Sequence, residues 1–303
     1  MSTHRMGAIQ IRTSCANPHA WSLGSHATVW RLAFVLAVAS PPPARAEADE
    51  LGRLAPCECP CATHRDECAA QSHSFVVRSF VGGPTAEGVA QHGEQLRSLL
   101  RRDVFDLDAT NRWHPRCAVV LHPTRQSYLT AVGPAAAQTV GSSSVTFAAG
   151  RVTERRIDLL ASDAQRGLAA LPHELAHVLF ADAFPITPPP KWAEEGLALL
   201  LDSPEKQARH RRDLDAAFRT RSVLPLRRFL ADTDYPNAAH RATFYAQSLS
   251  IVEYLTDADS PKQFLRFLRL AVDHGPEHAL QIVYGLNSEE LERAWRQQIL
   301  AGS

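Results

Sequence analysis

Residues 171–180 read LPHELAHVLF, and this stretch decides how the rest of the chain is interpreted. Within it, His173, Glu174 and His177 form the pattern H-E-x-x-H. On a helix, residues i and i+4 share one face, with Cβ atoms about 5–6 Å apart. Two imidazoles at that spacing can bind one Zn²⁺, and the intervening Glu174 can accept a proton from a metal-activated water. The stretch predicts a buried metal-binding helix; the competing interpretation is two histidines on a helix face beside an ordinary surface glutamate.

A candidate third ligand follows a proline-rich connection, where residues 191–201 read KWAEEGLALLL. Glu194 and Glu195 lie 17 and 18 positions after His177, and a helix that begins after the prolines can bring a carboxylate back to the metal. Two histidines and one glutamate leave a fourth position for water, as in catalytic zinc sites. Alternatively, the two glutamates form a solvated acidic first turn that interacts favourably with the helix dipole.

H-E-L-A-H followed by W-x-x-E-G-x-A resembles the gluzincin metallopeptidases, most closely the peptidase MA-like group of exported bacterial proteins. The resemblance covers residues 171–255, and residues 75–300 in layout. It implies a Zn²⁺ cofactor and a peptide or protein substrate. It also implies that Glu195, immediately before Gly196, is the third zinc ligand in place of Glu194, and that Trp192 packs over the site.

A tyrosine opens a later helical stretch, residues 244–255, which read FYAQSLSIVEYL. Gluzincins related to aminopeptidase N often carry a tyrosine at such a place, and its phenol stabilises the oxyanion of the tetrahedral intermediate. Tyr245 matches that tyrosine, with Ser248 at the position of a small residue. By periodicity alone, Tyr245 is equally well a core aromatic. The Gly-x-Met-Glu-Asn segment of those relatives is missing from this sequence, so aminopeptidase-type action is not expected.

Weaker candidates surround this constellation. Asp202, seven residues after Glu195, could orient a ligand histidine or could be a surface residue near a helix end. His210 and His240 could approach the metal, although a lone histidine is more often structural.

The wider patterning changes from mixed to helical along the chain. It predicts strands at 74–81, 117–121, 145–147 and 155–161, a turn at 141–144 and a helix at 86–102. Further helices are predicted near 172–182, 191–202, 204–219, 225–231, 241–257, 261–274 and 287–300. This order predicts an α+β, zincin-like domain over residues 73–303, with a strand-bearing lobe (73–165) before a helical lobe (166–303).

The strand at 155–161 comes just before the metal helix. In zincins generally, an edge strand at this place pairs with the substrate backbone, and residues 155–161 are placed to be that strand. An ordinary strand of the sheet is an equally good interpretation of these residues.

Charge sets residues 1–46 apart from the rest. The chain has 32 Lys+Arg and 32 Asp+Glu, but its first 46 residues hold four arginines and no acidic residue. The remainder therefore carries 28 basic and 32 acidic residues, a net charge of −4. Such a balance disfavours a uniformly basic nucleic-acid binder, so no nucleic acid is expected as a partner.

The apolar run at 32–40 is too short to span a bilayer and suits a secretory signal peptide, with Ala44-Arg45-Ala46 as a cleavage site. We predict a signal peptide over 1–46 and a secreted, periplasmic or envelope location. The alternatives are an uncleaved anchor or a buried core helix. No later stretch approaches the roughly 20 apolar residues of a spanning helix.

Residues 47–72 are polar and rich in cysteine, and we interpret them as a tether. In an oxidising compartment their cysteines, together with Cys117, are candidates for disulfides. Metal binding by thiolates is the alternative, although the spacing matches no zinc-finger pattern. The four cysteines of this tether are Cys57, Cys59, Cys61 and Cys68.

Together these features predict a zinc-dependent peptidase that hydrolyses peptide bonds with a metal-activated water. The alternative is a non-catalytic, zinc-stabilised envelope protein that uses the helical lobe as a binding module. Glu174 argues against the alternative, because a purely structural zinc site needs no general base.

Overall fold

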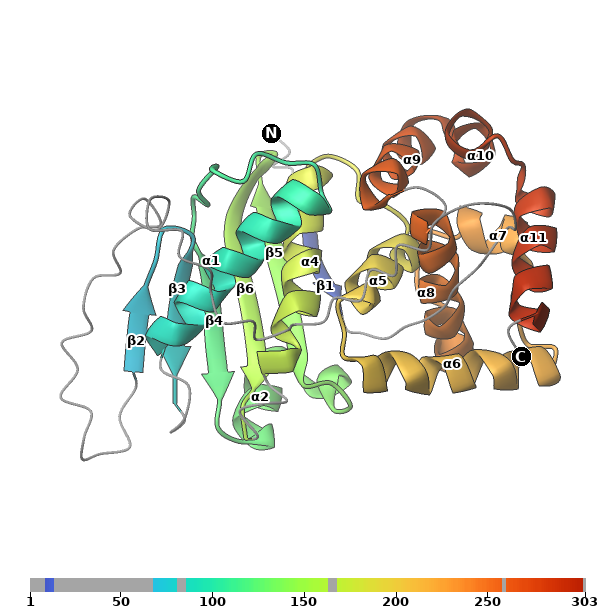
Figure 1. Cartoon of the computed structure of the whole chain (residues 1–303). Coiled ribbons are helices and arrows are strands. Elements are labelled where there is room, and N and C mark those ends of the chain that lie inside the picture. Colours follow the sequence, from blue (N-terminus) through green and yellow to red (C-terminus); the bar gives the residue numbers. More distant parts are fainter. Residues whose placement is uncertain (1–8, 14–67, 81–85, 163–167, 258–259, 302–303) are drawn as a thin grey trace, which may run out of the picture.

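The computed structural model describes residues 9–13, 68–80, 86–162, 168–257 and 260–301 (Figure 1). In this part of the chain a six-stranded sheet with its covering helices is followed by a group of helices, which confirms the predicted α+β fold. The last strand ends at Leu160 and the metal helix begins at Leu171, close to the predicted division between the two lobes.

The sheet has the strand order β1-β5-β6-β4-β3-β2. β3, β4 and β6 run parallel to one another, and the remaining pairs are antiparallel. The parallel pair β3 and β4 is joined by α1 (Ala86–Asp103), as parallel neighbours require a crossover connection. The strands are β1 (Ile9–Thr13), β2 (Cys68–Gln71), β3 (Phe75–Ser79), β4 (Cys117–His122), β5 (Gly141–Ala148) and β6 (Arg151–Leu160).

Burial alternates along β3 and along the first half of β5, whereas residues 157–160 of the inner strand β6 are all buried. On β6, Ile157 and Leu159 are fully buried, on the face that α4 (Leu171–Ala183) covers (Figure 1). A second helix, α2 (Arg125–Val132), contacts β4 and β6 and buries Tyr128 against Leu160. The sheet is thus packed against the helix that carries H-E-x-x-H.

Residues 155–161 are not an edge strand, so the substrate-pairing interpretation is wrong and the ordinary-strand interpretation is the correct one. They belong to β6, which lies between β5 and β4 and is hydrogen-bonded on both sides. α4 also contacts β5, the strand next to β6. On its other side β5 pairs with β1, which is the last strand at this end of the sheet. The error follows from residues 141–144: Gly and Ser read as a turn, whereas they form the first half of β5.

The helices of the second lobe lie close to their predicted positions. They are α4, α5 (Lys191–Leu200), α6 (Pro204–Arg219), α7 (Leu226–Ala231), α8 (Arg241–Asp257), α9 (Pro261–His274), α10 (Pro276–Tyr284) and α11 (Ser288–Ala301). α10 and α2 were not predicted. Gly275 ends α9 with φ 83° and Pro276 opens α10, so this pair separates two helices where the pattern indicated a connection.

α5 lies unusually close to α8. A Cβ placed on Gly196 would lie 2.5 Å from the carbonyl oxygen of Ser248 and 2.5 Å from a methyl group of Val252. The absence of a side chain at Gly196 therefore allows the two helices to touch and fixes the position of Glu195. Trp192 on α5 is buried among the rings of Phe229, Phe264 and Phe267.

The C-terminal end of α4 is anchored through Asp182. Its carboxylate accepts hydrogen bonds from Arg101 of α1 at 2.6 Å, Arg155 of β6 at 2.7 Å and Trp113 at 2.5 Å. Charge-assisted hydrogen bonds of this kind are the stronger ones in proteins. The metal helix is consequently tied to both the sheet and α1.

Two strands fall in segments that the sequence assigned elsewhere. β1 lies in the predicted signal peptide, and Cys68–Gln71 of the predicted tether forms β2, at the edge of the sheet. Cys68 and the buried Cys117 are free thiols, whereas Cys57, Cys59 and Cys61 lie outside the described residues.

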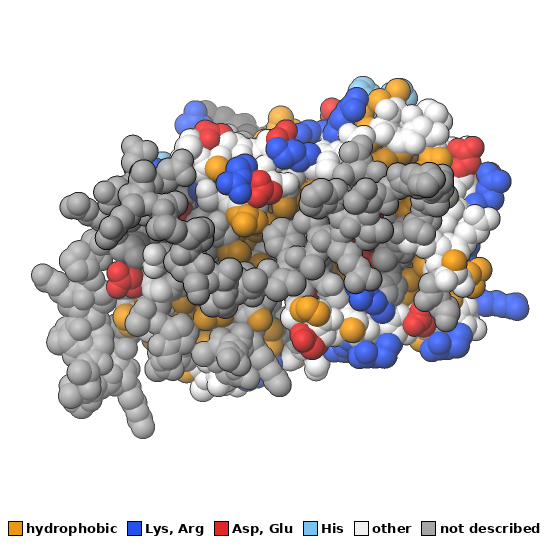
Figure 2. All heavy atoms as spheres, in the orientation of Figure 1, with side chains coloured by type: hydrophobic (Ala, Val, Ile, Leu, Met, Phe, Trp, Pro, Cys, Tyr) orange, Lys and Arg blue, Asp and Glu red, His pale blue; other side chains and the backbone are white. Residues whose placement is uncertain are grey.

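In the described part of the chain, none of the helices combines the length and apolar character needed to cross a bilayer. On the face drawn in Figure 2, both Lys or Arg and Asp or Glu side chains lie along the edge of the helical lobe that α6 forms.

Candidate metal centre

Three potential metal ligands meet between α4 and α5. His173 and His177 lie one turn apart on α4, and their Nε2 atoms are 3.1 Å apart. Glu195 comes from α5, with its Oε2 atom 3.9 Å from His173 Nε2 and 3.8 Å from His177 Nε2. The three side chains are buried. The structure therefore brings together the three residues that the sequence predicted as ligands.

Their geometry and charge fit a divalent cation. Tetrahedral zinc at about 2.0–2.1 Å from each nitrogen would hold two nitrogens about 3.4 Å apart. In the described structure, the buried Oε2 atom of Glu195 has no hydrogen-bond partner, which is costly for a carboxylate. Burial also raises the pKa of Glu195 to about 7, although nearby His177 opposes this. A cation among the three atoms would satisfy the free oxygen and stabilise the charged carboxylate.

Each histidine is oriented by a second carboxylate. His173 Nδ1 lies 3.1 Å from Asp202 Oδ2, and His177 Nδ1 lies 3.1 Å from Glu194 Oε1. When Nδ1 carries the proton and donates it, Nε2 presents its lone pair to a metal. Asp202 thus lies where the sequence predicted an orienting residue, and Glu194 orients a ligand as well.

Two lysines keep these orienting carboxylates charged. Lys206 Nζ lies 2.7 Å from Asp202, and Lys191 Nζ lies 2.5 Å from Glu194. Burial by itself would raise the pKa of both carboxylates, but the histidines and lysines outweigh it and hold both pKa values below their usual range. Burial lowers the pKa of His173, which favours the neutral imidazole that a metal requires.

Glu174 is completely buried and is held against β5. Ser143 Oγ donates a hydrogen bond of 2.7 Å to Glu174 Oε2. A Cβ on Gly141 would lie 2.6 Å from Glu174 Oε1, so any larger residue there would displace the carboxylate. Gly141 and Ser143, two small residues of the stretch predicted to be a turn, therefore position Glu174.

A family model of the Peptidase MA superfamily matches residues 141–301. The chain belongs to the Peptidase MA superfamily. The match begins at Gly141, the first residue of β5, and extends through the ligand group to the last helix, so it includes the residues that contact Glu174. No curated protein and no solved structure matches the chain.

Tyr235 of this Peptidase MA centre, like Ser143, was not predicted from the sequence. Tyr235, in the connection between α7 and α8, donates a hydrogen bond of 2.5 Å to Glu195 Oε1. Burial and the adjacent carboxylates raise the pKa of Tyr235 well above its usual value, so its phenol stays protonated and remains a donor. Glu195 thus has one oxygen held by Tyr235 and the other directed at the histidines.

The ring of Tyr245 lies beside that of Tyr235, the residue that contacts Glu195. Its ring centroid is 6.2 Å from that of Tyr235 and 5.4 Å from that of Phe244, and its side chain is half-buried at the start of α8. Its role as an oxyanion donor stays a prediction. His210 and His240 contact Asp213 and Asn237 respectively and do not belong to the ligand group.

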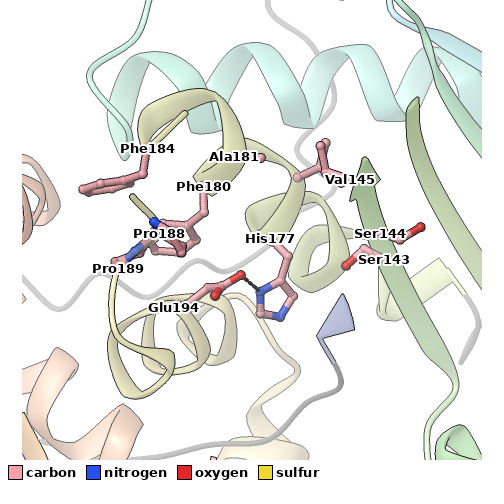
Figure 3. Close-up of a pocket in the computed structure, with 11 residues that line it drawn as sticks. Ser143, Ser144, Val145, His177, Phe180, Ala181, Phe184, Pro188, Pro189 and Glu194 are labelled. Atoms are coloured by element: carbon pink, nitrogen blue, oxygen red, sulfur yellow. Dashed lines mark hydrogen bonds and ion pairs between the residues drawn. The ribbon is translucent and has the colours of Figure 1, made fainter. Parts of the chain in front are cut away.

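A pocket opens beside His177 (Figure 3). Its walls come from β5, from the second half of α4 and from the proline-rich connection to α5, and Glu194 lies at its margin in contact with His177. The lining residues are Ser143, Ser144, Val145, His177, Val178, Phe180, Ala181, Phe184, Pro188, Pro189 and Glu194.

Proposed function

We propose that this member of the Peptidase MA superfamily is a zinc-dependent peptidase, with His173, His177 and Glu195 as the zinc ligands. The observation that carries the proposal is the arrangement of Glu174: a buried carboxylate beside three converging ligand atoms, one of which is a buried oxygen without a hydrogen-bond partner. A structural zinc site would need four protein ligands and no neighbouring base, whereas this group offers three ligands and a base.

When bound, zinc would supply a Lewis acid and lower the pKa of water at the open fourth position. Glu174 would accept a proton from the attacking water on its carboxylate and pass that proton to the leaving amine. The hydrogen bond from Ser143 would keep the Glu174 carboxylate in one orientation through both transfers. Tyr245 would donate to the oxyanion, as the resemblance to gluzincins implies.

The substrate would be a peptide or protein bound in an extended conformation along β5. This edge already accepts an antiparallel strand, since β1 pairs with it from Ile9 opposite Phe147 to Thr13 opposite Ser143. Backbone hydrogen bonds to a strand edge are sequence-independent and suit a peptide ligand. We further propose that the protein is exported and cleaved after Ala46, which would remove β1 and leave the edge open to substrate.

The decisive experiment is metal analysis of the chain that begins at Glu47, combined with a peptide-library assay with and without chelator. We expect one zinc per chain and cleavage that stops with chelator and returns with zinc. Glu174→Gln should keep zinc and lose at least about 100-fold in kcat, because general-base catalysis contributes about 10²–10⁴-fold. His177→Ala should lose both zinc and activity.

Three outcomes would contradict the proposal. If Glu174→Gln cleaves as fast as the parent chain, Glu174 is not the base. If His177→Ala retains stoichiometric zinc, the ligand assignment is wrong. Tight zinc binding with no hydrolysis of any library peptide would favour the non-catalytic envelope protein.

A further inference from the structure

The pocket beside His177 is apolar along most of its wall (Figure 3). Its apolar lining residues are Val145, Val178, Phe180, Ala181, Phe184, Pro188 and Pro189. The two ionisable residues at its edge are already engaged, since His177 Nδ1 lies 3.1 Å from Glu194, whose other oxygen lies 2.5 Å from Lys191 Nζ. The pocket thus offers no free charge to a ligand.

The position of the pocket relative to Glu174 follows from the packing of β5 against α4, which run in the same direction. At the start of β5, Gly141 and Ser143 contact Glu174 near the start of α4. Farther along β5, Val145 faces the pocket together with Ala181, two turns farther along α4 than Glu174. The pocket therefore lies on the Val145 side of Glu174.

The direction of a peptide on β5 is indicated by β1. β1 runs antiparallel to β5, with Ile11 opposite Val145 and Thr13 opposite Ser143. A peptide bound in the same sense has its amino-terminal part beside Val145 and its carboxyl-terminal part beside Gly141. Relative to a peptide bond held at Glu174, the pocket is on the amino-terminal side.

We propose that this pocket is a specificity site that binds an apolar side chain from one of the two residues preceding the scissile bond. The inference rests on the proposed function and adds the class of substrate to it: extended peptides with an apolar residue at that place. A charged side chain is disfavoured, because it would be buried without a partner.

The first test compares peptides that vary only at the two residues preceding the cleaved bond. The zinc-loaded chain that begins at Glu47 is assayed by mass spectrometry on sets with Ala, Val, Leu, Phe, Asp or Lys there. We expect kcat/KM to be at least about ten-fold higher for the best apolar side chain than for Ala, Asp or Lys, since each well-packed methylene contributes roughly ten-fold or more.

Two substitutions then change the size of the pocket. Ala181→Leu fills the pocket and should lower kcat/KM for the preferred peptide about ten-fold more than for the Ala peptide. Phe184→Ala enlarges it and should shift the preference towards larger side chains. Ala183→Leu is the matched control, because Ala183 lies on the same helix but does not line the pocket. Zinc content and melting temperature are measured for each.

A binding measurement separates recognition from turnover. In the Glu174→Gln background, titration with the preferred peptide should show a Kd about ten-fold weaker when Ala181→Leu is added. Cleavage without apolar preference, or a preference that neither Ala181→Leu nor Phe184→Ala changes, overturns the pocket assignment and leaves the peptidase proposal standing. Absence of any chelator-sensitive cleavage overturns the peptidase proposal and the pocket assignment with it.

Discussion

At the scale of single residues, Ser143 is the contact that prepares Glu174 for catalysis. Its hydroxyl is the donor in a buried hydrogen bond of 2.7 Å to the carboxylate, and hydrogen bonds to charged groups contribute about 1.5–3 kcal/mol. We expect Ser143→Ala to lower kcat roughly ten- to hundred-fold with zinc content unchanged, measured by steady-state kinetics and metal analysis. Ser142→Ala is the control, because alternate residues of a strand point to opposite faces. Unchanged kcat in Ser143→Ala would refute this role.

Tyr235 and Tyr245 can be distinguished by what each substitution changes. Tyr235→Phe removes the hydrogen bond to Glu195, and loss of such a partner typically weakens metal binding 10–100-fold. We therefore expect a Kd for zinc weaker by about ten-fold or more, measured by competition with a chelating dye. Tyr245→Phe should leave that Kd unchanged and lower kcat instead, as removal of an oxyanion donor does. Equal zinc affinity in Tyr235→Phe and the parent chain would show that Tyr235 does not hold the ligand.

The sequence was informative about residues whose relation is local. The two ligand histidines are four positions apart, so helical geometry alone relates them to one metal. Glu195 required the resemblance to gluzincins in addition, because spacing left Glu194 equally possible. The Ser143–Glu174 and Tyr235–Glu195 contacts join residues 31 and 40 positions apart, and a single sequence carries no periodicity that would relate them.

At the scale of elements, the close contact of α5 with α8 determines where Glu195 lies. Gly196→Ala would place a Cβ 2.5 Å from the Ser248 carbonyl oxygen, so the helices would have to separate. Overpacking of this kind costs about 1–3 kcal/mol, and we expect Gly196→Ala to lower the free energy of unfolding by that amount and to weaken zinc binding. Denaturant unfolding and dye competition measure the two effects.

The matched control for this helix contact is Gly88→Ala, also within a helix but at an exposed position of α1. Alanine is favoured over glycine in an exposed helix by up to about 1 kcal/mol, so this variant should be as stable as the parent chain or more so. A Gly196→Ala protein with unchanged stability would mean that the helices are not held at this distance.

Strands and helices differed in how well the sequence predicted them. The helices of the second lobe repeat buried positions over many turns, and most of their predicted limits agree with the structure to within a residue or two. β5 was half missed, because its buried positions at Gly141 and Ser143 are small to make room for Glu174. The residues shaped most by the site were therefore the least typical of a strand.

At the scale of the whole molecule, the site joins the two lobes. The three ligands belong to the helical lobe, whereas the hydrogen bond that positions Glu174 comes from β5 in the strand-bearing lobe. Arg155 of β6 and Arg101 of α1 hold the other end of α4 through Asp182. The metal helix is therefore held to the sheet near both of its ends.

Zinc should accordingly stabilise the whole domain. A ligand that binds only the folded state adds RT ln(1 + [L]/Kd), which is about 2.7 kcal/mol at 100 times Kd. For a domain of this size we expect removal of zinc with a chelator to lower the Tm by roughly 5–10 °C in calorimetry, and added zinc to restore it. The Tm of His177→Ala should equal that of the zinc-free parent chain both with chelator and with added zinc, because this variant cannot assemble the ligand group. A parent chain whose Tm is the same with chelator and with zinc would contradict metal binding at His173, His177 and Glu195.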